Sequence, residues 1–198
     1  MQCLMFNLQS MMNNLDVSLL QLSQTSQASS LDDVMLVLTN GLTWIPLYLI
    51  ILYILWKRIP SRRQLLFVLV IGLLCVAFVA GLNNLFIKPF VGRLRPCCDP
   101  ALAGVIRIVD GTCATNYSFF SSHAANTSAI AVFFSLVVRH HWFSFTMLLW
   151  CLLNCYTRLY LAQHFPSDIF CGLLFGSLMA WLFHRGYLSL SRNCMVTP

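Results

Sequence analysis

Long apolar stretches constrain this chain more than any other feature, because few folds place so many of them in so short a sequence. Five stretches approach the roughly 20 residues that a helix needs to cross a bilayer. They are Leu42–Trp56 (with a start as early as Val34 left open), Leu65–Ile87, Ala124–Val138, Trp142–Tyr160 and Ile169–Phe183. Only 9% of the residues are charged, against about 25% in soluble domains. Because lipid cannot satisfy exposed backbone groups, the sequence predicts an all-α, polytopic membrane helix bundle of about five spans, forming one domain over residues 1–198.

The basic residues orient this bundle. Positive charge concentrates in cytoplasmic loops, and seven of the twelve cations fall on one side of the predicted spans, namely Lys57, Arg58, Arg62, Arg63, Arg139, Arg185 and Arg192. The other five fall on the opposite side, namely Lys88, Arg93, Arg95, Arg107 and Arg158. Three of these five, Lys88, Arg95 and Arg158, are the candidate phosphate-binding cations of the motifs described below. We therefore expect the candidate site to face away from the cytoplasm.

Residues 1–40 precede the first predicted span. Leu15, Leu19 and Leu22 recur at helical spacing, which predicts a helix lying in the membrane interface; a poorly ordered tail is the alternative. The polar stretch 23–30 is predicted to be a loop. The first thirty residues lack a basic start followed by an apolar core, so we expect no secretory signal of the usual form.

The cysteines divide by compartment. Four lie in predicted spans, where small buried thiols are ordinary: Cys75, Cys151, Cys155 and Cys171. Cys97, Cys98 and Cys113 lie in the outer loop, residues 88–120, where an oxidising compartment permits a disulfide. Pairing Cys113 with either neighbour closes a loop of about sixteen residues and contributes about 3 kcal/mol; both pairings stay open. Adjacent cysteines lack the separated spacing of a zinc site, so no metal is expected.

Three short segments at the ends of apolar stretches gather the residues suited to phosphate chemistry. They are Lys88-Pro-Phe-Val-Gly-Arg-Leu-Arg95-Pro96, Ser118-Phe-Phe-Ser-Ser-His123 and Thr157-Arg158-Leu-Tyr-Leu-Ala-Gln-His164-Phe-Pro-Ser-Asp168. Each has a simpler interpretation in isolation: interfacial cations that anchor a helix, a serine helix cap, and an Arg158–Asp168 pair that ties two helices together. The predicted topology brings all three to one face, however, and ionisable groups at membrane depth are usually functional.

Together the segments hold what phosphoryl transfer requires. Lys88, Arg95 and Arg158 balance the charge of a phosphate dianion, and an arginine binds two oxygens at once. Ser121 and Ser122 lie before a helix whose N-terminus offers free N–H groups to phosphate. One histidine can attack phosphorus while the other protonates the leaving oxygen. Asp168, four residues after His164, is expected to form a hydrogen bond that fixes the tautomer of that histidine and raises its nucleophilicity.

The pattern Lys-x6-Arg-Pro, Ser-x-His and Arg-x5-His-x3-Asp resembles the type 2 phosphatidic acid phosphatase superfamily of membrane lipid phosphatases, over Lys88 to Asp168. The resemblance implies a helical bundle and metal-independent catalysis, with no cofactor. It makes His164 the nucleophile that forms a phosphohistidine, Asp168 its orienting partner, and His123 the general acid and then the base. The phosphate would be bound by Lys88, Arg95, Ser121, Ser122 and Arg158.

Three residues depart from the family pattern. Phe120 and Ser122 replace the Pro and Gly of Pro-Ser-Gly-His, and Thr157 replaces a Ser. Thr157 keeps the hydroxyl, and Ser122 keeps its backbone N–H, although it disfavours a positive φ. Since the cations, histidines and aspartate are intact, we expect an active enzyme.

The resemblance favours a lipid phosphate or pyrophosphate hydrolase with its active site at the outer face of a bacterial inner membrane. Undecaprenyl pyrophosphate or a phospholipid phosphate, such as phosphatidate or phosphatidylglycerol phosphate, is the leading expectation for the substrate, taken from the bilayer. Lipid A phosphate is the alternative within the family. A non-catalytic protein that binds or transports lipid phosphates is the alternative outside it. No nucleic acid is expected as a partner, and the sequence does not specify an oligomeric state.

Overall fold

The structure, a computed structural model, describes residues 14–24, 29–109, 113–114 and 116–195. In these ranges it consists of helices joined by short loops, with no strand. After a helix at residues 14–23, the α-helices are α2 (Ser29–Thr39), α3 (Ile45–Arg58), α4 (Arg62–Leu82), α5 (Lys88–Val91), α6 (Ser122–Val138), α7 (His141–Tyr160) and α8 (Pro166–Met195). A π-helical turn, Asn83–Ile87, joins α4 to α5.

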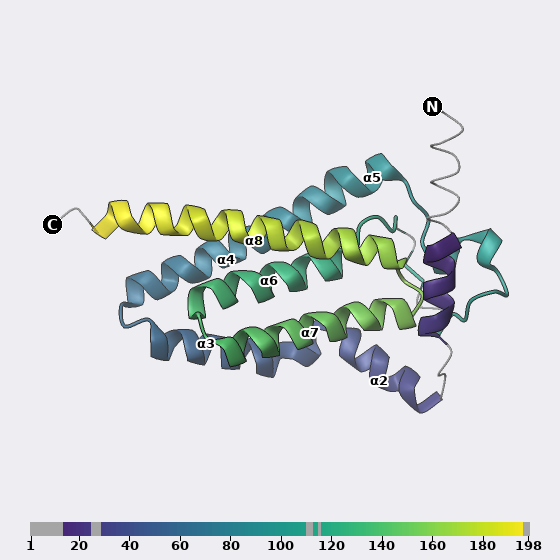
Figure 1. Cartoon of the computed structure of the whole chain (residues 1–198), viewed down its shortest axis with the longest axis horizontal. Coiled ribbons are helices and arrows are strands. Elements are labelled where there is room, and N and C mark those ends of the chain that lie inside the picture. The colour runs from purple at the N-terminus through teal and green to yellow at the C-terminus, as the bar shows by residue number, and fades with distance from the viewer. Residues whose placement is uncertain (1–13, 25–28, 110–112, 115, 196–198) are drawn as a thin grey trace.

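The long helices lie lengthwise beside one another (Figure 1). The chain direction alternates, so α5 and α7 end, and α6 and α8 begin, at the same end of the bundle. The outer loop that follows α5 also lies there. The three motif segments therefore meet at one end of the molecule, as the predicted topology requires.

Close packing of α6 against α8 fixes this end of the bundle. A Cβ atom added at Gly172 would lie 2.7 Å from the carbonyl oxygen of Ser121, and one added at Gly176 would lie 2.1 Å from that of Ala125. The Gly-x-x-x-Gly spacing thus lets two backbones approach as in membrane helix pairs. The backbone N–H of Ser121 donates to the carbonyl oxygen of Asp168 at 3.1 Å. The second and third motifs are consequently held together by backbone contacts.

A helix occupies each of the five predicted stretches. By length and composition, Arg62–Val91 and Pro166–Ser191 can each cross a membrane, and α2 with α3 forms a third candidate bent by 74°. The apolar helix α6 has 17 residues. Large apolar side chains face outward along the bundle, among them Leu73 and Phe170, as in a protein surrounded by lipid. The helix that contains the fifth apolar stretch is longer than that stretch, since α8 continues beyond Phe183 to Met195.

The first predicted span begins at a sharp bend. α2 ends at Thr39, and the 3₁₀ turn Gly41–Trp44 redirects the chain into α3. The Asn40 side chain caps this turn by accepting from the N–H of Leu42 at 3.0 Å. The Trp44 indole donates to the carbonyl oxygen of Leu38 at 2.9 Å. Thr39 is thereby placed at the end of the bundle that carries the motifs.

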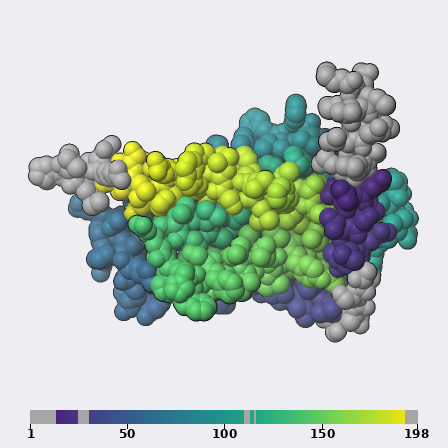
Figure 2. Space-filling view, in the orientation of Figure 1, coloured from purple at the N-terminus to yellow at the C-terminus, as the bar shows by residue number. Residues whose placement is uncertain are grey.

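The predicted N-terminal helix is present at residues 14–23 and lies across the same end of the bundle, against the outer loop and the start of α8 (Figure 2). Leu15, Leu19 and Leu22 point outward, more than half of each being exposed. Asp16 and Leu20 face the protein and are buried. This arrangement fits a helix in the membrane interface. Part of the predicted loop at residues 23–30 lies outside the described residues, and from Ser29 the chain is helical.

Replacing Gly176 by Ala tests the α6–α8 contact. The added methyl group must displace the backbone of Ala125, so we expect the free energy of unfolding to fall by about 1–3 kcal/mol. A fall of several degrees in the midpoint of thermal unfolding in detergent would show it. The matched control is Gly186→Ala in the same helix, where a Cβ meets nothing within 4 Å. Equal midpoints of thermal unfolding for the two variants would contradict the close α6–α8 contact.

Candidate active site

Three buried cations converge at the motif-bearing end of the bundle. Lys88 starts α5, Arg95 follows in the outer loop, and Arg158 lies in the last turn of α7. Each is no more than 8% exposed, and Lys88 interacts electrostatically with both arginines. Buried charges require pairing, yet none of the three forms an ion pair among the described residues. The cluster is thus suited to receive an anion.

His164 lies beside this cluster in the loop between α7 and α8. Its Nε2 atom is 3.3 Å from Nη1 of Arg95, and its Nδ1 atom is 3.2 Å from the hydroxyl of Ser118. Nδ1 is 3.8 Å from Oδ2 of Asp168, too far for a hydrogen bond. His164 and Asp168 are thus neighbours, as the sequence predicts, and the Ser118 hydroxyl contacts both side chains.

Asp168 is fully buried in the first turn of α8. Its Oδ1 accepts from Arg93 at 2.7 Å, and its Oδ2 accepts from the Ser118 hydroxyl and from the N–H of Phe165 at 3.0 Å. The ion-pair partner of Asp168 is thus Arg93. The simpler interpretation of the third segment, an Arg158–Asp168 tie, is not what the structure shows.

The Arg158 side chain contacts the bend that precedes α3. Its Nη1 donates to the Thr39 hydroxyl at 2.6 Å, and its buried Nε has no hydrogen-bond partner among the described residues. The backbone of Thr39 also hydrogen-bonds His123, the half-buried histidine of α6. Sequence reasoning missed Thr39, because nothing in the sequence signals that the bend at Asn40 points it toward the motifs.

The serines of the second motif differ in their contacts. Ser121, fully buried, caps α6 by accepting from the N–H of Ala124 at 3.4 Å. The Ser122 hydroxyl accepts from the Asn83 amide at 2.9 Å and donates to Asn84 at 3.0 Å. Two asparagines of the π-helical turn thus hold the hydroxyl that replaces the family's glycine. They were not foreseen, since a polar pair at a span end has no specific signature.

Phe120, the other departure from the family pattern, packs into the core. Its ring lies 4.9 Å from that of Phe175 on α8, centroid to centroid. Its carbonyl oxygen accepts from the Asn83 amide at 2.9 Å. Asn83 therefore links the end of α4 to the start of the second motif. The Phe120 side chain therefore packs against α8 in the core and not among the cations.

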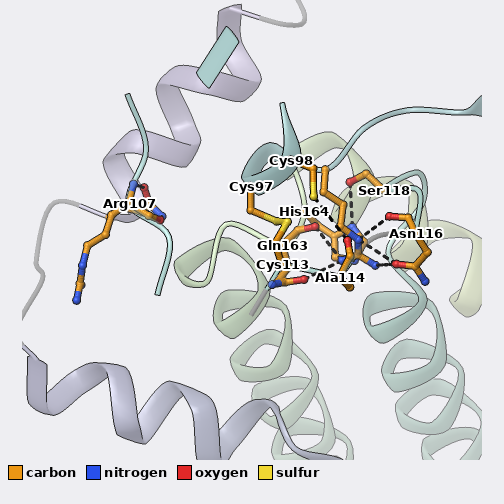
Figure 3. Close-up of a disulfide and its surroundings, with 11 residues drawn as sticks. Cys97, Cys98, Arg107, Cys113, Ala114, Asn116, Ser118, Gln163 and His164 are labelled. Carbon is orange, nitrogen blue, oxygen red and sulfur yellow. Dashed lines mark hydrogen bonds between the residues drawn. A yellow bond between two sulfur atoms is a disulfide. The ribbon is translucent and has the colours of Figure 1, made fainter. Parts of the chain in front are cut away.

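Arg95 is held in place by polar groups of two loops. It donates to the carbonyl and side-chain oxygens of Asn116, at 2.9 and 2.6 Å, and to those of Gln163, at 3.1 and 3.0 Å. Figure 3 shows Asn116 and Gln163 close to His164. Burial lowers the pKa of Arg95 and also that of His164, which falls to about 3. The imidazole is therefore neutral at physiological pH.

Two further ion pairs attach the N-terminal region to this end. Asp16 accepts from Arg93 at 2.7 Å and from the backbone of Ser167 at 2.9 Å. Arg107 pairs with Asp32 on α2, and this contact raises the pKa of Arg107. Arg107, one of the outer cations, is therefore held in an internal ion pair.

The outer loop is closed by a disulfide between Cys97 and Cys113 (Figure 3). Cys98 remains a free, exposed thiol. These three cysteines form the one group in the described residues whose atoms lie close enough to bind a metal together. Because two of the three sulfurs are bonded to each other, the group lacks the thiolates that zinc binding requires.

The fold and the cation–histidine cluster define a membrane protein built to bind and cleave phosphate esters. The sequence model of the PAP2 superfamily matches residues 64–192, and the chain belongs to this superfamily. It is 35% identical over 174 residues to a lipid A 4'-phosphatase of Bacteroides thetaiotaomicron, covering 87% of this chain and 77% of that protein. It is 30% identical over 146 residues to one of Porphyromonas gingivalis, covering 74% of this chain and 61% of that protein.

Solved structures share the fold. A PAP2-type phosphatidylglycerolphosphate phosphatase from Bacillus subtilis superimposes with a TM-score of 0.63 at 21% identity, over 90% of this chain and 86% of that one. Aquifex aeolicus LpxE superimposes with a TM-score of 0.59 at 23% identity, over 86% and 95%. The prediction of a PAP2-type helical membrane fold is confirmed. The chain is accordingly an enzyme, a phosphoric ester hydrolase.

The lowered pKa of His164 has a measurable consequence. Between about pH 3 and the ordinary value near 6.5, the unfolded chain binds a proton at this residue and the folded one does not. Protonation therefore disfavours the folded state as pH falls through 6.5. In ¹⁵N-histidine NMR spectra, we expect the ring nitrogens of His164, assigned with a His164→Gln variant, to keep the neutral pattern from pH 8 to 5. A midpoint near 6.5 would contradict the burial argument.

Replacing Thr39 by Val tests the contact with Arg158. The variant removes the accepting oxygen and keeps the shape, so the guanidinium loses its fixed position. Since a hydrogen bond to a charged group contributes about 1.5–3 kcal/mol, we expect KM for a phosphate ester to rise at least about tenfold. Thr43→Val, which removes the hydroxyl donating to Val37 in the same bend, should leave KM within about twofold. Equal KM values for the two variants would rule the contact out.

Proposed function

We propose that this protein hydrolyses the 4'-phosphate monoester of lipid A at the outer face of a bacterial inner membrane. The sequence similarity to two lipid A 4'-phosphatases, 35% and 30% identical, supports this choice of substrate. The leading expectation from the sequence, undecaprenyl pyrophosphate or a phospholipid phosphate, has no comparable support among these relatives. Lipid A phosphate, the alternative within the family, is therefore preferred.

The uncompensated cations at the end of the bundle are the observation that carries the catalytic part of the proposal. Lys88, Arg95 and Arg158 bind the phosphate dianion and stabilise the charge of the pentacoordinate transition state. The N–H groups at the start of α6, near Ser121 and Ser122, bind its oxygens. Fixed positive charge thus supplies the electrostatic stabilisation, and we propose that no metal is required.

The two histidines divide the chemistry. Nε2 of His164 attacks phosphorus, the bond from phosphorus to the sugar oxygen breaks, and His123 protonates the departing oxygen. His123 then takes a proton from water, the water oxygen attacks phosphorus, and the phosphorus–nitrogen bond breaks. The cycle releases inorganic phosphate and restores both histidines.

The charge distribution supports the proposed location. Lys57, Arg58 and Arg139 lie at the opposite end of the bundle from the cation cluster, and the positive-inside rule assigns them to the cytoplasm. The candidate site then faces the periplasm, where an oxidising environment favours the Cys97–Cys113 disulfide. Lipid substrates reach it from the outer leaflet.

Phosphate release by the purified protein in detergent tests the proposal. We expect kcat/KM for lipid A to exceed that for undecaprenyl pyrophosphate, phosphatidate and phosphatidylglycerol phosphate at least about tenfold, with loss of the 4'-phosphate in mass spectra. His164→Gln should lower kcat at least about 10³-fold. His140→Gln is the matched control. It lies beside Arg139, at the end of the bundle opposite the cation cluster, and should keep its activity. Binding of lipid A without release of phosphate would instead indicate a non-catalytic binding protein.

A further inference from the structure

Ser118 lies between the two residues that the sequence predicts to be partners. It is fully buried in the segment that leads into α6, and its backbone N–H donates to the carbonyl oxygen of Arg93 at 2.8 Å. Its hydroxyl is 3.2 Å from Nδ1 of His164 and within hydrogen-bond distance of Oδ2 of Asp168. The two partners are themselves 3.8 Å apart.

The contacts of Asp168 explain this spacing. Oδ2, the oxygen nearer His164, already accepts from the Ser118 hydroxyl and from the N–H of Phe165 at 3.0 Å. Oδ1 accepts from Arg93 at 2.7 Å. The carboxylate is thus saturated on the side that faces the imidazole, and the serine oxygen is the acceptor within reach of Nδ1.

The direction of each hydrogen bond follows from Arg95. A guanidinium only donates, so Nε2 of His164, 3.3 Å from Arg95 Nη1, accepts and carries no proton. A neutral imidazole then carries its proton on Nδ1 and donates it to the Ser118 oxygen. The single hydroxyl proton of Ser118 is left for Asp168. Every donor and acceptor in the chain His164–Ser118–Asp168 is satisfied in this one arrangement.

We propose that Ser118 is a positioning residue that holds His164 in the Nδ1–H tautomer and transmits the charge of Asp168 to it. This inference rests on the proposed role of His164 as the nucleophile. When Nε2 bonds to phosphorus, the ring becomes cationic and its Nδ1–H becomes a stronger donor. The Ser118 oxygen, polarised by the Asp168 carboxylate, stabilises that charge. No proton is transferred between His164, Ser118 and Asp168 in this step.

The tautomer of the wild-type protein tests the inference without any substrate. In ¹⁵N-histidine NMR spectra at neutral pH, His164 should show a protonated Nδ1 and an unprotonated Nε2. A protonated Nε2 would overturn the proposal. Because this measurement needs no turnover, its outcome is independent of which lipid the enzyme hydrolyses, and it remains informative if the proposed substrate is wrong.

The variant Ser118→Ala removes the bridging oxygen. Its His164 signals should show mixed tautomers, and kcat should fall about 10- to 100-fold, the usual effect of losing a partner that orients a functional histidine, with KM within about threefold. Ser128→Ala is the matched control, since this buried hydroxyl donates to the carbonyl oxygen of Ala125 in its own helix and, among the described residues, to no group of the site. It should keep kcat within about twofold.

A double variant separates positioning from general loss of structure. If Ser118 acts through Asp168, then Ser118→Ala combined with Asp168→Asn should lower kcat by no more than about threefold beyond Asp168→Asn alone. If the losses of kcat in the two single variants instead multiply in the double variant, the two residues act independently and the proposal is overturned. If Ser118→Ala does not fold in detergent, as judged by size-exclusion chromatography, the wild-type tautomer decides the question.

Discussion

Uncompensated positive charge at the outer end of the bundle is the constraint on which the rest of the site depends. Lys88, Arg95 and Arg158 are buried, and burying like charges together is costly. Neutral oxygens hold the two arginines: Asn116 and Gln163 hold Arg95, and Thr39 holds Arg158. Neutral acceptors orient the cations without cancelling their charge, so the attraction for a phosphate dianion is retained.

The acidic groups follow a complementary arrangement. Asp168 and Asp16 both pair with Arg93, and Asp32 pairs with Arg107, so the ion pairs of these carboxylates are made with arginines other than the phosphate-binding cations. The N-terminal helix and α2, which lie outside the five-helix bundle, supply two of these aspartates and the Thr39 contact. The region preceding the first span therefore belongs to the site as much as the motif segments do.

The sequence predicted the helical membrane fold and the meeting of the three motifs, because these follow from apolar length and alternating chain direction. It did not predict the Thr39 contact or the position of Ser118, because both arise from long-range geometry. Thr39 depends on a bend of 74°, and Ser118 on the distance of 3.8 Å between His164 and Asp168. The four-residue spacing in the sequence suggested a hydrogen bond between that pair, and only the packed structure shows the serine in contact with both.

The most direct test of the account is to trap the phosphorylated enzyme. Rapid mixing with ³²P-labelled lipid A, followed by alkaline quench and peptide mass spectrometry, should place the label on His164 as an acid-labile phosphate that appears before free phosphate. His140→Gln should give the same labelled peptide, and His164→Gln none. Turnover of the lipid without a labelled peptide, or with the label on another residue, would contradict the assignment of His164 as the nucleophile among these cations.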